Sequence, residues 1–251
     1  MVYWMFREKR VKSMTVPWGN KRLDSCSIED ILRAMGISEY EREIHRIYKG
    51  IRDKILQRLN GFREVWERGS EDKIWKELVF CLLTPQSKAE KCWEAVKGLE
   101  RKGLLFEGAM ERMAEELKPV RFRFNKARYI VEARKRLFVD GRPRIREKLK
   151  KFENPFDARE WMVKNIKGMG YKEASHFLRN IGLGENLAIL DRHILKNLLK
   201  LGVISSIPPS LSRRQYLEIE KKFIEYAKKT GIPPAHLDFV LWYRETGKVF
   251  K

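Results

Sequence analysis

Apolar residues recur at intervals of three and four along most of the chain, and this spacing is typical of amphipathic helices. From about Glu41 the pattern runs through Ile44, Ile47, Ile51 and Ile55. Later stretches predict helices near residues 171–181, 191–202, 211–229 and 234–245, and proline pairs separate the last three. No alternating pattern after residue 40 competes with these stretches. We therefore expect a mainly helical core over residues 41–251.

Residues 1–40 have a different pattern and are interpreted as an N-terminal extension. The runs 2–6 and 14–18 are candidates for short strands, and Ser27 begins a sequence that resembles a helix cap. The pattern leaves open whether this extension packs on the core or forms a separate lobe.

One helix boundary in the core has a strong local signal. A helix that includes Trp75 is expected to end near Thr84, because Pro85 disfavours helical geometry in the residue before it. Ser87 is expected to cap the next helix, with Glu90 three residues later completing a capping box.

The charge of the chain points to a polyanionic partner. Lysine and arginine number 54 against 34 acidic residues, so the formal net charge is +20, and the basic residues are spread along the chain. A basic folded protein of this size most often binds nucleic acid. The other interpretation is a solvated surface suited to high temperature, as in an archaeal or thermophilic prokaryote, and the two are compatible.

Cysteine usage and hydropathy exclude several classes of protein. The three cysteines, Cys26, Cys81 and Cys92, do not form a closely spaced set of four, which disfavours a cysteine-only zinc or iron–sulfur site. Their odd number argues against a disulfide framework. The chain has no recognisable signal peptide and no run of about 18 apolar residues, so we expect a soluble cytoplasmic protein with no membrane partner.

Two glycines separate two of the expected helices. Gly168 and Gly170 flank Met169, and residues 166–172 are interpreted as a hairpin. Glycine allows the chain to reverse in few residues and leaves backbone N–H groups uncovered at a helix start, where they bind phosphate. Lys167 would strengthen the local positive field. An ordinary helix–turn–helix corner has the same pattern, so the hairpin alone leaves both interpretations open.

A lysine and an aspartate follow the hairpin, 19 residues apart (191 − 172). Lys172 begins the next helix, where the helix dipole and partial burial favour the neutral amine that a nucleophile requires. His176 lies one turn later on the same face and is either a group that tunes Lys172 or a structural histidine. Asp191 is suited to cap a helix, and its rigid carboxylate is equally suited to stabilise positive charge on a sugar ring.

Three blocks of sequence carry a resemblance to a known family: residues 165–182, 211–220 and 237–251. Together with the hairpin, lysine and aspartate, they resemble the helix–hairpin–helix DNA glycosylases. Within that superfamily the chain is similar, over roughly residues 45–251, to the short archaeal-type second family of 8-oxoguanine DNA glycosylase/lyases. The resemblance implies a two-lobed helical fold and a monomer that acts on double-stranded DNA containing a damaged purine.

The resemblance also implies roles for individual residues. Lys172 would attack C1′ of a flipped-out nucleotide and form a Schiff base, and β-elimination would then cut the strand. Asp191 would stabilise the cationic sugar and help to deprotonate the lysine. Trp242 would form an aromatic wall of the base pocket, and Lys251 would make a polar contact to the base. No cofactor is required, although hairpin carbonyls could hold a monovalent cation beside a phosphate.

Two departures from the family pattern leave the lesion open. The chain has Thr84-Pro-Gln-Ser87 where the close relatives have Thr-Ala-Asn, and Gln86 is the type of residue that fills the gap left by a flipped base elsewhere in the superfamily. The extension of about 40 residues is the other departure. Deaminated or alkylated purines, such as hypoxanthine or an alkyladenine, are therefore alternative substrates. A non-catalytic DNA-binding module is a further alternative, whereas the lack of a cysteine cluster disfavours an iron–sulfur pyrimidine glycosylase.

Overall fold

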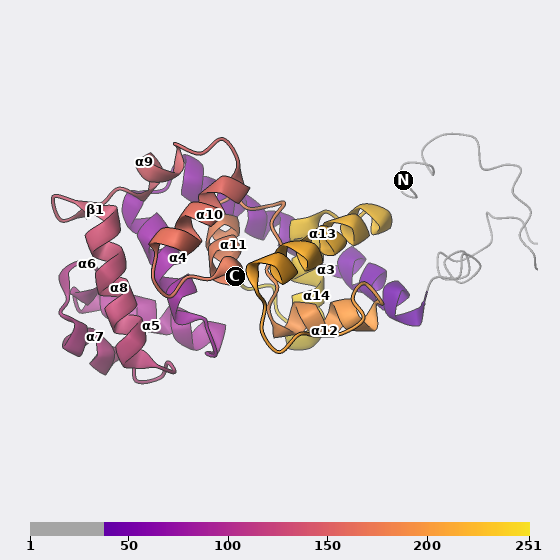
Figure 1. The fold of residues 1–251 in the computed structure, drawn as a ribbon, viewed down its shortest axis with the longest axis horizontal. Helices are drawn as coiled ribbons and strands as arrows, with labels where there is room; N and C mark the ends of the chain where they lie inside the picture. The colour runs from indigo at the N-terminus through magenta and orange to yellow at the C-terminus, as the bar shows by residue number, and fades with distance from the viewer. Residues whose placement is uncertain (1–37) are drawn as a thin grey trace, which may run out of the picture. The chain divides into compact units, whose positions relative to one another are not determined.

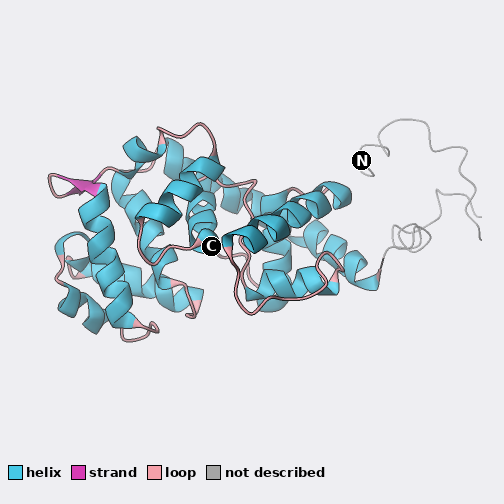
Figure 2. Cartoon of the chain, viewed as in Figure 1, coloured by secondary structure: helices cyan, strands magenta, loops and turns pink. Residues whose placement is uncertain are grey.

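The computed structural model describes residues 38–251, and in this range the chain is folded almost entirely as helices (Figure 1). Figure 2 shows loops and one short pair of strands between them. The prediction of a mainly helical core is confirmed. The strands and the cap predicted before residue 38 lie outside the described residues, and the domain boundary predicted at residue 40 stays a prediction.

The helices before the hairpin are α3 (Glu39–Glu67), α4 (Glu71–Leu83), α5 (Ala89–Arg101), α6 (Leu104–Glu107), α7 (Met110–Glu116), α8 (Arg123–Leu137), α9 (Ile145–Leu149) and α10 (Pro155–Asn165). The helices after it are α11 (Tyr171–Asn180), α12 (Arg192–Lys200), α13 (Arg213–Thr230) and α14 (Pro234–Thr246). The last four agree with the predicted ranges to within about two residues, as expected for helix boundaries.

The described residues divide into two compact units. The first, here called the Asp191 unit, comprises residues 38–55 and 190–249. The second, here called the hairpin unit, comprises residues 56–189 together with 250–251. Helix α3 therefore contributes its first part to one unit and its last part to the other.

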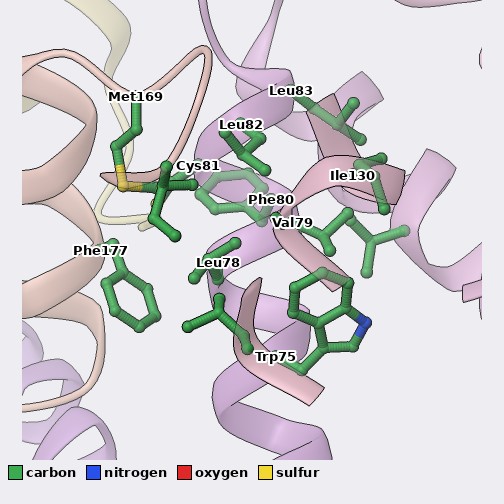
Figure 3. Close-up of a cluster of buried hydrophobic side chains, with 14 of the residues drawn as sticks. Trp75, Leu78, Val79, Phe80, Cys81, Leu82, Leu83, Ile130, Met169 and Phe177 are labelled. Atoms are coloured by element: carbon green, nitrogen blue, oxygen red, sulfur yellow. The ribbon is translucent and has the colours of Figure 1, made fainter. Parts of the chain in front are cut away.

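Helix α4 forms the centre of the hairpin unit. Apart from Lys76, every residue from Ile74 to Leu83 is buried, so this helix is covered on all sides rather than along one stripe. Figure 3 shows its apolar side chains packed with Ile130 of α8 and Phe177 of α11. The indole N–H of Trp75 donates to the carbonyl oxygen of Leu105 at 3.1 Å, so the largest core side chain has no unsatisfied polar atom.

The Asp191 unit is built from the first part of α3 and from α12, α13 and α14. Helix α14 contacts both α12 and α13, and Phe223 of α13 and Phe239 of α14 are fully buried. Glu245 at the end of α14 accepts hydrogen bonds from Lys196 at 3.2 Å and from Arg244 at 2.9 Å. This network holds α12, whose first residue follows Asp191, against α14.

Side chains cap several of the helices, and one capping prediction is wrong. Asn154 caps α10 and Ser212 caps α13, each by accepting backbone N–H bonds. The prediction that Ser87 caps the next helix is wrong, because α5 begins at Ala89 with Lys88 at its cap position and no side-chain cap bond. The hydroxyl of Ser87 instead accepts from the backbone N–H of Arg121 at 3.1 Å and from Lys126 Nζ at 3.0 Å.

The strand pair was not predicted. Strands β1 (Phe138–Val139) and β2 (Arg142–Pro143) pair antiparallel across a two-residue turn. Asp140 and Gly141 form that turn with φ values of +50° and +73°. Asp-Gly is a common sequence for such a turn, so the signal was present although the strands are too short to show alternation.

Helices long and apolar enough to cross a membrane do not occur between residues 38 and 251.

Candidate active site

The hairpin between α10 and α11 is fixed by packing as well as by backbone geometry. Gly168 has a φ of +82°, and a Cβ atom there would lie 2.2 Å from Cδ2 of the Tyr129 ring. Met169 is 4% exposed and belongs to the core cluster of the hairpin unit, and Figure 3 shows its side chain among that cluster. The tip is therefore held by Tyr129 on one side and by the core on the other.

The expectation that Gly170 presents an uncovered N–H is wrong. Gly170 has a φ of −89°, which other residues adopt readily, and its N–H donates to Oε2 of Glu173 at 3.2 Å. A carboxylate at the third residue of a helix commonly accepts from the N–H of the cap residue, and its negative charge is stabilised by the positive end of the helix dipole. Lys167 is exposed, with its ammonium 3.6 Å from a carboxylate oxygen of Glu132. Phosphate binding at this hairpin stays a prediction.

Lys172, the second residue of α11, is partly buried, as predicted. Its side chain is 22% exposed and its Nζ lies 3.2 Å from Oε1 of Glu173. Nζ also donates to Oγ1 of Thr84 at 3.2 Å. Because the Thr84 hydroxyl donates its own proton to the carbonyl of Cys81 at 2.9 Å, its oxygen is left to accept from the lysine amine. The nitrogen is thus oriented, and the side chain as a whole stays partly exposed.

Gln86 lies in the same unit, on the turn that follows α4. It is exposed and has a φ of +54°, a conformation that is uncommon for residues other than glycine. Thr84 precedes it by two residues, so the turn that presents Gln86 also carries the hydroxyl that binds Lys172.

Lys251 also belongs to the hairpin unit and is held by an acid and two aromatic rings. Its ammonium forms an ion pair with Glu77, with side chains 9% and 7% exposed. The same nitrogen lies 3.5 Å from the centre of the Trp93 ring and 5.5 Å from that of Phe80. Burial lowers the pKa of Lys251, and Glu77 acts in the opposite direction. The second oxygen of Glu77 accepts from Asn180 at 3.1 Å.

His176 lies beside this group and is 6% exposed. Its ring meets Phe80 edge-on, with 5.5 Å between ring centres. Burial lowers the pKa of His176 well below its usual value, and the charges of Arg179 and Lys172 lower it further. The imidazole is therefore neutral at pH 7. Neither ring nitrogen has a hydrogen-bond partner within the described chain.

Asp191 and Trp242 belong to the Asp191 unit. Oδ1 of Asp191 accepts from the backbone N–H of His193 at 2.8 Å and of Ile194 at 2.9 Å, which confirms the helix-capping role. Trp242 in α14 is half-buried. The other predicted site residues, Lys172, Gln86, His176 and Lys251, belong to the hairpin unit.

Four residues near the predicted site were missed: Glu77, Thr84, Trp93 and Lys126. Glu77 had a signal, because an acid that directly precedes six apolar residues is expected to be buried with a partner. Thr84 was noted only as a helix end. Trp93 and Lys126 had no signal, since their partners are distant in sequence.

The helical core, the glycine hairpin and the lysine that follows it define a helix–hairpin–helix DNA glycosylase. The sequence model of the family described as "8-oxoguanine DNA glycosylase" matches residues 55–232. The chain therefore belongs to the 8-oxoguanine DNA glycosylase family.

Individual relatives match the chain over nearly their whole length. An 8-oxoguanine DNA glycosylase/AP lyase of Fusobacterium nucleatum is 47% identical, over 85% of this chain and 99% of the relative. One from Korarchaeum cryptofilum is 42% identical, over 86% of this chain and 100% of the relative. A crystal structure shows the Methanocaldococcus jannaschii 8-oxoguanine glycosylase/lyase in complex with a 15mer DNA containing 8-oxoguanine. Its protein chain is 37% identical in sequence to this chain and matches its fold with a TM-score of 0.77, over 85% of this chain and 100% of that one.

Proposed function

We propose that the protein excises 8-oxoguanine from double-stranded DNA and then cuts the strand at the resulting abasic site, with Lys172 as nucleophile. The substrate is supported by the relatives, which carry this activity in their names and match nearly end to end. The observation that carries the mechanism is the position of the Lys172 amine. Lys172 directly follows the hairpin, its side chain is partly exposed, and Thr84 orients its amine at 3.2 Å.

In the proposed reaction the neutral amine of Lys172 attacks C1′, and the bond from C1′ to the base nitrogen breaks. The electron pair leaves with the base, which takes up a proton, and the attacking nitrogen loses one. The sugar ring opens to a Schiff base. Loss of a C2′ proton then expels the 3′ phosphate with the electron pair of the C3′–O bond, and water hydrolyses the Schiff base to release the enzyme.

Asp191 is proposed to stabilise the positive charge that develops on the sugar as the base leaves and to help deprotonate the lysine. Two backbone N–H groups hold its carboxylate through Oδ1, so the charge is fixed before the substrate arrives. A preoriented charge stabilises a transition state without the cost of reorganisation.

Base recognition is proposed to involve the remaining predicted residues. Lys251 would make the polar contact and Trp242 the aromatic one, and exposed Gln86 would fill the gap in the duplex. His176 is buried beside Phe80, and its role as a group that tunes Lys172 stays a prediction.

No metal is required by this chemistry, and the monovalent cation at the hairpin stays a prediction. We further propose that the protein works as a monomer in the cytoplasm of a prokaryote, where the chromosome is its substrate.

The experiment is borohydride trapping on a duplex with one 8-oxoguanine opposite cytosine. Wild type should form a covalent adduct, and Lys172→Gln should form none, whereas Lys150→Gln, an exposed lysine at the end of α9, should match wild type. Asp191→Asn keeps a good helix cap and should slow base release about 100-fold. An adduct that persists in Lys172→Gln would refute the nucleophile. Faster cutting of hypoxanthine or alkyladenine duplexes would refute the substrate.

A further inference from the structure

Lys126 is a buried cation outside the predicted site. It lies on α8 and is only 3% exposed. Its ammonium donates to the carbonyl oxygens of Leu83 at 2.6 Å and Pro85 at 2.7 Å, and to Oγ of Ser87 at 3.0 Å. An ammonium has three donors, so all of them are used.

All three acceptors lie on one short segment, residues 83–87, here called the 83–87 turn. Carbonyls at a helix C-terminus have no partner within the helix, and Lys126 provides one for Leu83 at the end of α4. The turn also holds Gln86 at a positive φ, a strained conformation that persists only when its surroundings enforce it. Lys126 bonds to the turn on both sides of Gln86.

The same turn orients the proposed nucleophile. Thr84 lies between the two residues whose carbonyls Lys126 binds, and its Oγ1 accepts from Lys172 Nζ at 3.2 Å. A displacement of the turn would therefore move the hydroxyl that orients the amine. The reaction rate depends steeply on the position of the reacting nitrogen, because a misplacement of about 1 Å can lower the rate about 100-fold.

A charged group is a costly way to fill this position. Burial disfavours the ammonium and lowers the pKa of Lys126 to about 8. A methionine would fill much of the same volume without that cost, but it would leave two carbonyls and a hydroxyl unsatisfied. The lysine is thus explained by what it binds rather than by packing.

We propose that Lys126 is a positioning residue, which holds the 83–87 turn so that Thr84 keeps the amine of Lys172 in the geometry needed for Schiff-base formation. The proposal rests on Lys172 being the nucleophile. It assigns Lys126 no contact with DNA.

The test measures the single-turnover rate of borohydride trapping on a duplex with one abasic site, per folded protein. We expect Lys126→Met to lower the rate about 10- to 100-fold, while affinity for a reduced, uncleavable abasic duplex changes about twofold or less. Lys135→Met, an exposed lysine on the same helix, should leave both quantities at the wild-type level.

A double-mutant cycle separates positioning from a general loss of stability. If Lys126 acts through Thr84, then adding Lys126→Met to Thr84→Val should slow trapping little further, because the link is already broken. Effects that multiply would overturn the proposal, as would wild-type trapping by Lys126→Met. If Lys126→Met does not fold, Ser87→Ala decides the question. This variant removes one acceptor and should slow trapping several-fold, and an unchanged rate would refute the proposal.

The same assay distinguishes this inference from the proposed function. An adduct that persists in Lys172→Gln would mean that another amine is the nucleophile. An adduct lost in Lys172→Gln but formed at the wild-type rate in Lys126→Met would refute only the role of Lys126.

Discussion

The buried ion pair between Glu77 and Lys251 allows a prediction that joins stability to substrate recognition. In Glu77→Gln the side chain keeps its size, and its carbonyl can still accept from Asn180. It then presents an uncharged amide to an ammonium whose side chain is only 9% exposed. Removing one partner of a buried pair typically costs about 3–5 kcal/mol.

The variant can avoid an unpaired buried ammonium if residues 250–251 detach from the hairpin unit. The free energy of that detachment is therefore an upper limit to the cost. Release forfeits the contact of Phe250 with Phe80, whose ring centres lie 6.4 Å apart, and the stacking of Lys251 on Trp93. These contacts contribute about 1 and 2 kcal/mol, and partial burial of Phe250 adds about 1 kcal/mol. We therefore expect a loss of about 3–4 kcal/mol in the free energy of unfolding, or a Tm lower by roughly 6–15 °C.

Thermal unfolding at pH 7 measures this loss, and Glu116→Gln provides the control. Glu116 pairs with exposed Lys102 in the same unit and should cost less than about 1 kcal/mol. Adding Glu77→Gln to Lys251→Met should cost nothing further or restore part of the stability, because the ammonium is already absent and the change removes an unpaired buried carboxylate. Equal losses for Glu77→Gln in both backgrounds would refute the argument.

The same variant separates base recognition from strand cutting. Because an abasic site has no base, Glu77→Gln should slow excision of 8-oxoguanine while trapping on abasic DNA stays near wild type. Equal losses in both assays would mean that Lys251 does not act through the base.

Two further predictions concern the hairpin and the buried lysine. Gly168→Ala should lower the free energy of unfolding by about 2–3 kcal/mol, through strain at φ +82° and a clash with Tyr129. Gly141→Ala, at φ +73° with open space around it, should cost only about 1 kcal/mol, and urea titration of both variants measures the difference. Burial lowers the pKa of Lys126 in the folded protein to about 8, below its pKa in the unfolded chain. Above about pH 8 the unfolded chain therefore binds more protons at this lysine than the folded protein does. Stability relative to Lys126→Met should therefore rise by about 2 kcal/mol from pH 7 to 9.5, and a flat difference would contradict the pKa.

Local sequence signals predicted the last four helices and the hairpin because their determinants lie within a few residues. Asp191 caps α12 through its own neighbours, and Lys172 follows the glycines directly. Ser87 failed for the opposite reason, since Lys126, 39 residues away, takes its hydroxyl.

The surroundings of the site were harder to predict because they depend on contacts that are distant in sequence. Glu77 and Lys251 are 174 residues apart, and neither the periodicity nor the charge of the chain specifies such a pair. The contact of the Lys251 ammonium with the Trp93 ring also joins residues that are distant in sequence. Sequence patterns therefore indicated the proposed nucleophile but not the groups that hold Lys251.

The discontinuity of the Asp191 unit has a consequence for biosynthesis. Residues 38–55 leave the ribosome early, yet their partners begin at residue 190, after the contiguous stretch 56–189. At about 5–20 residues per second, the 60 residues from 190 to 249 take about 3–12 s to translate. During that interval the nascent chain already contains Lys172, while the unit that holds Asp191 is still incomplete. The proposed nucleophile is thus synthesised before the unit that holds Asp191 can fold, so both units are complete only when translation is nearly finished.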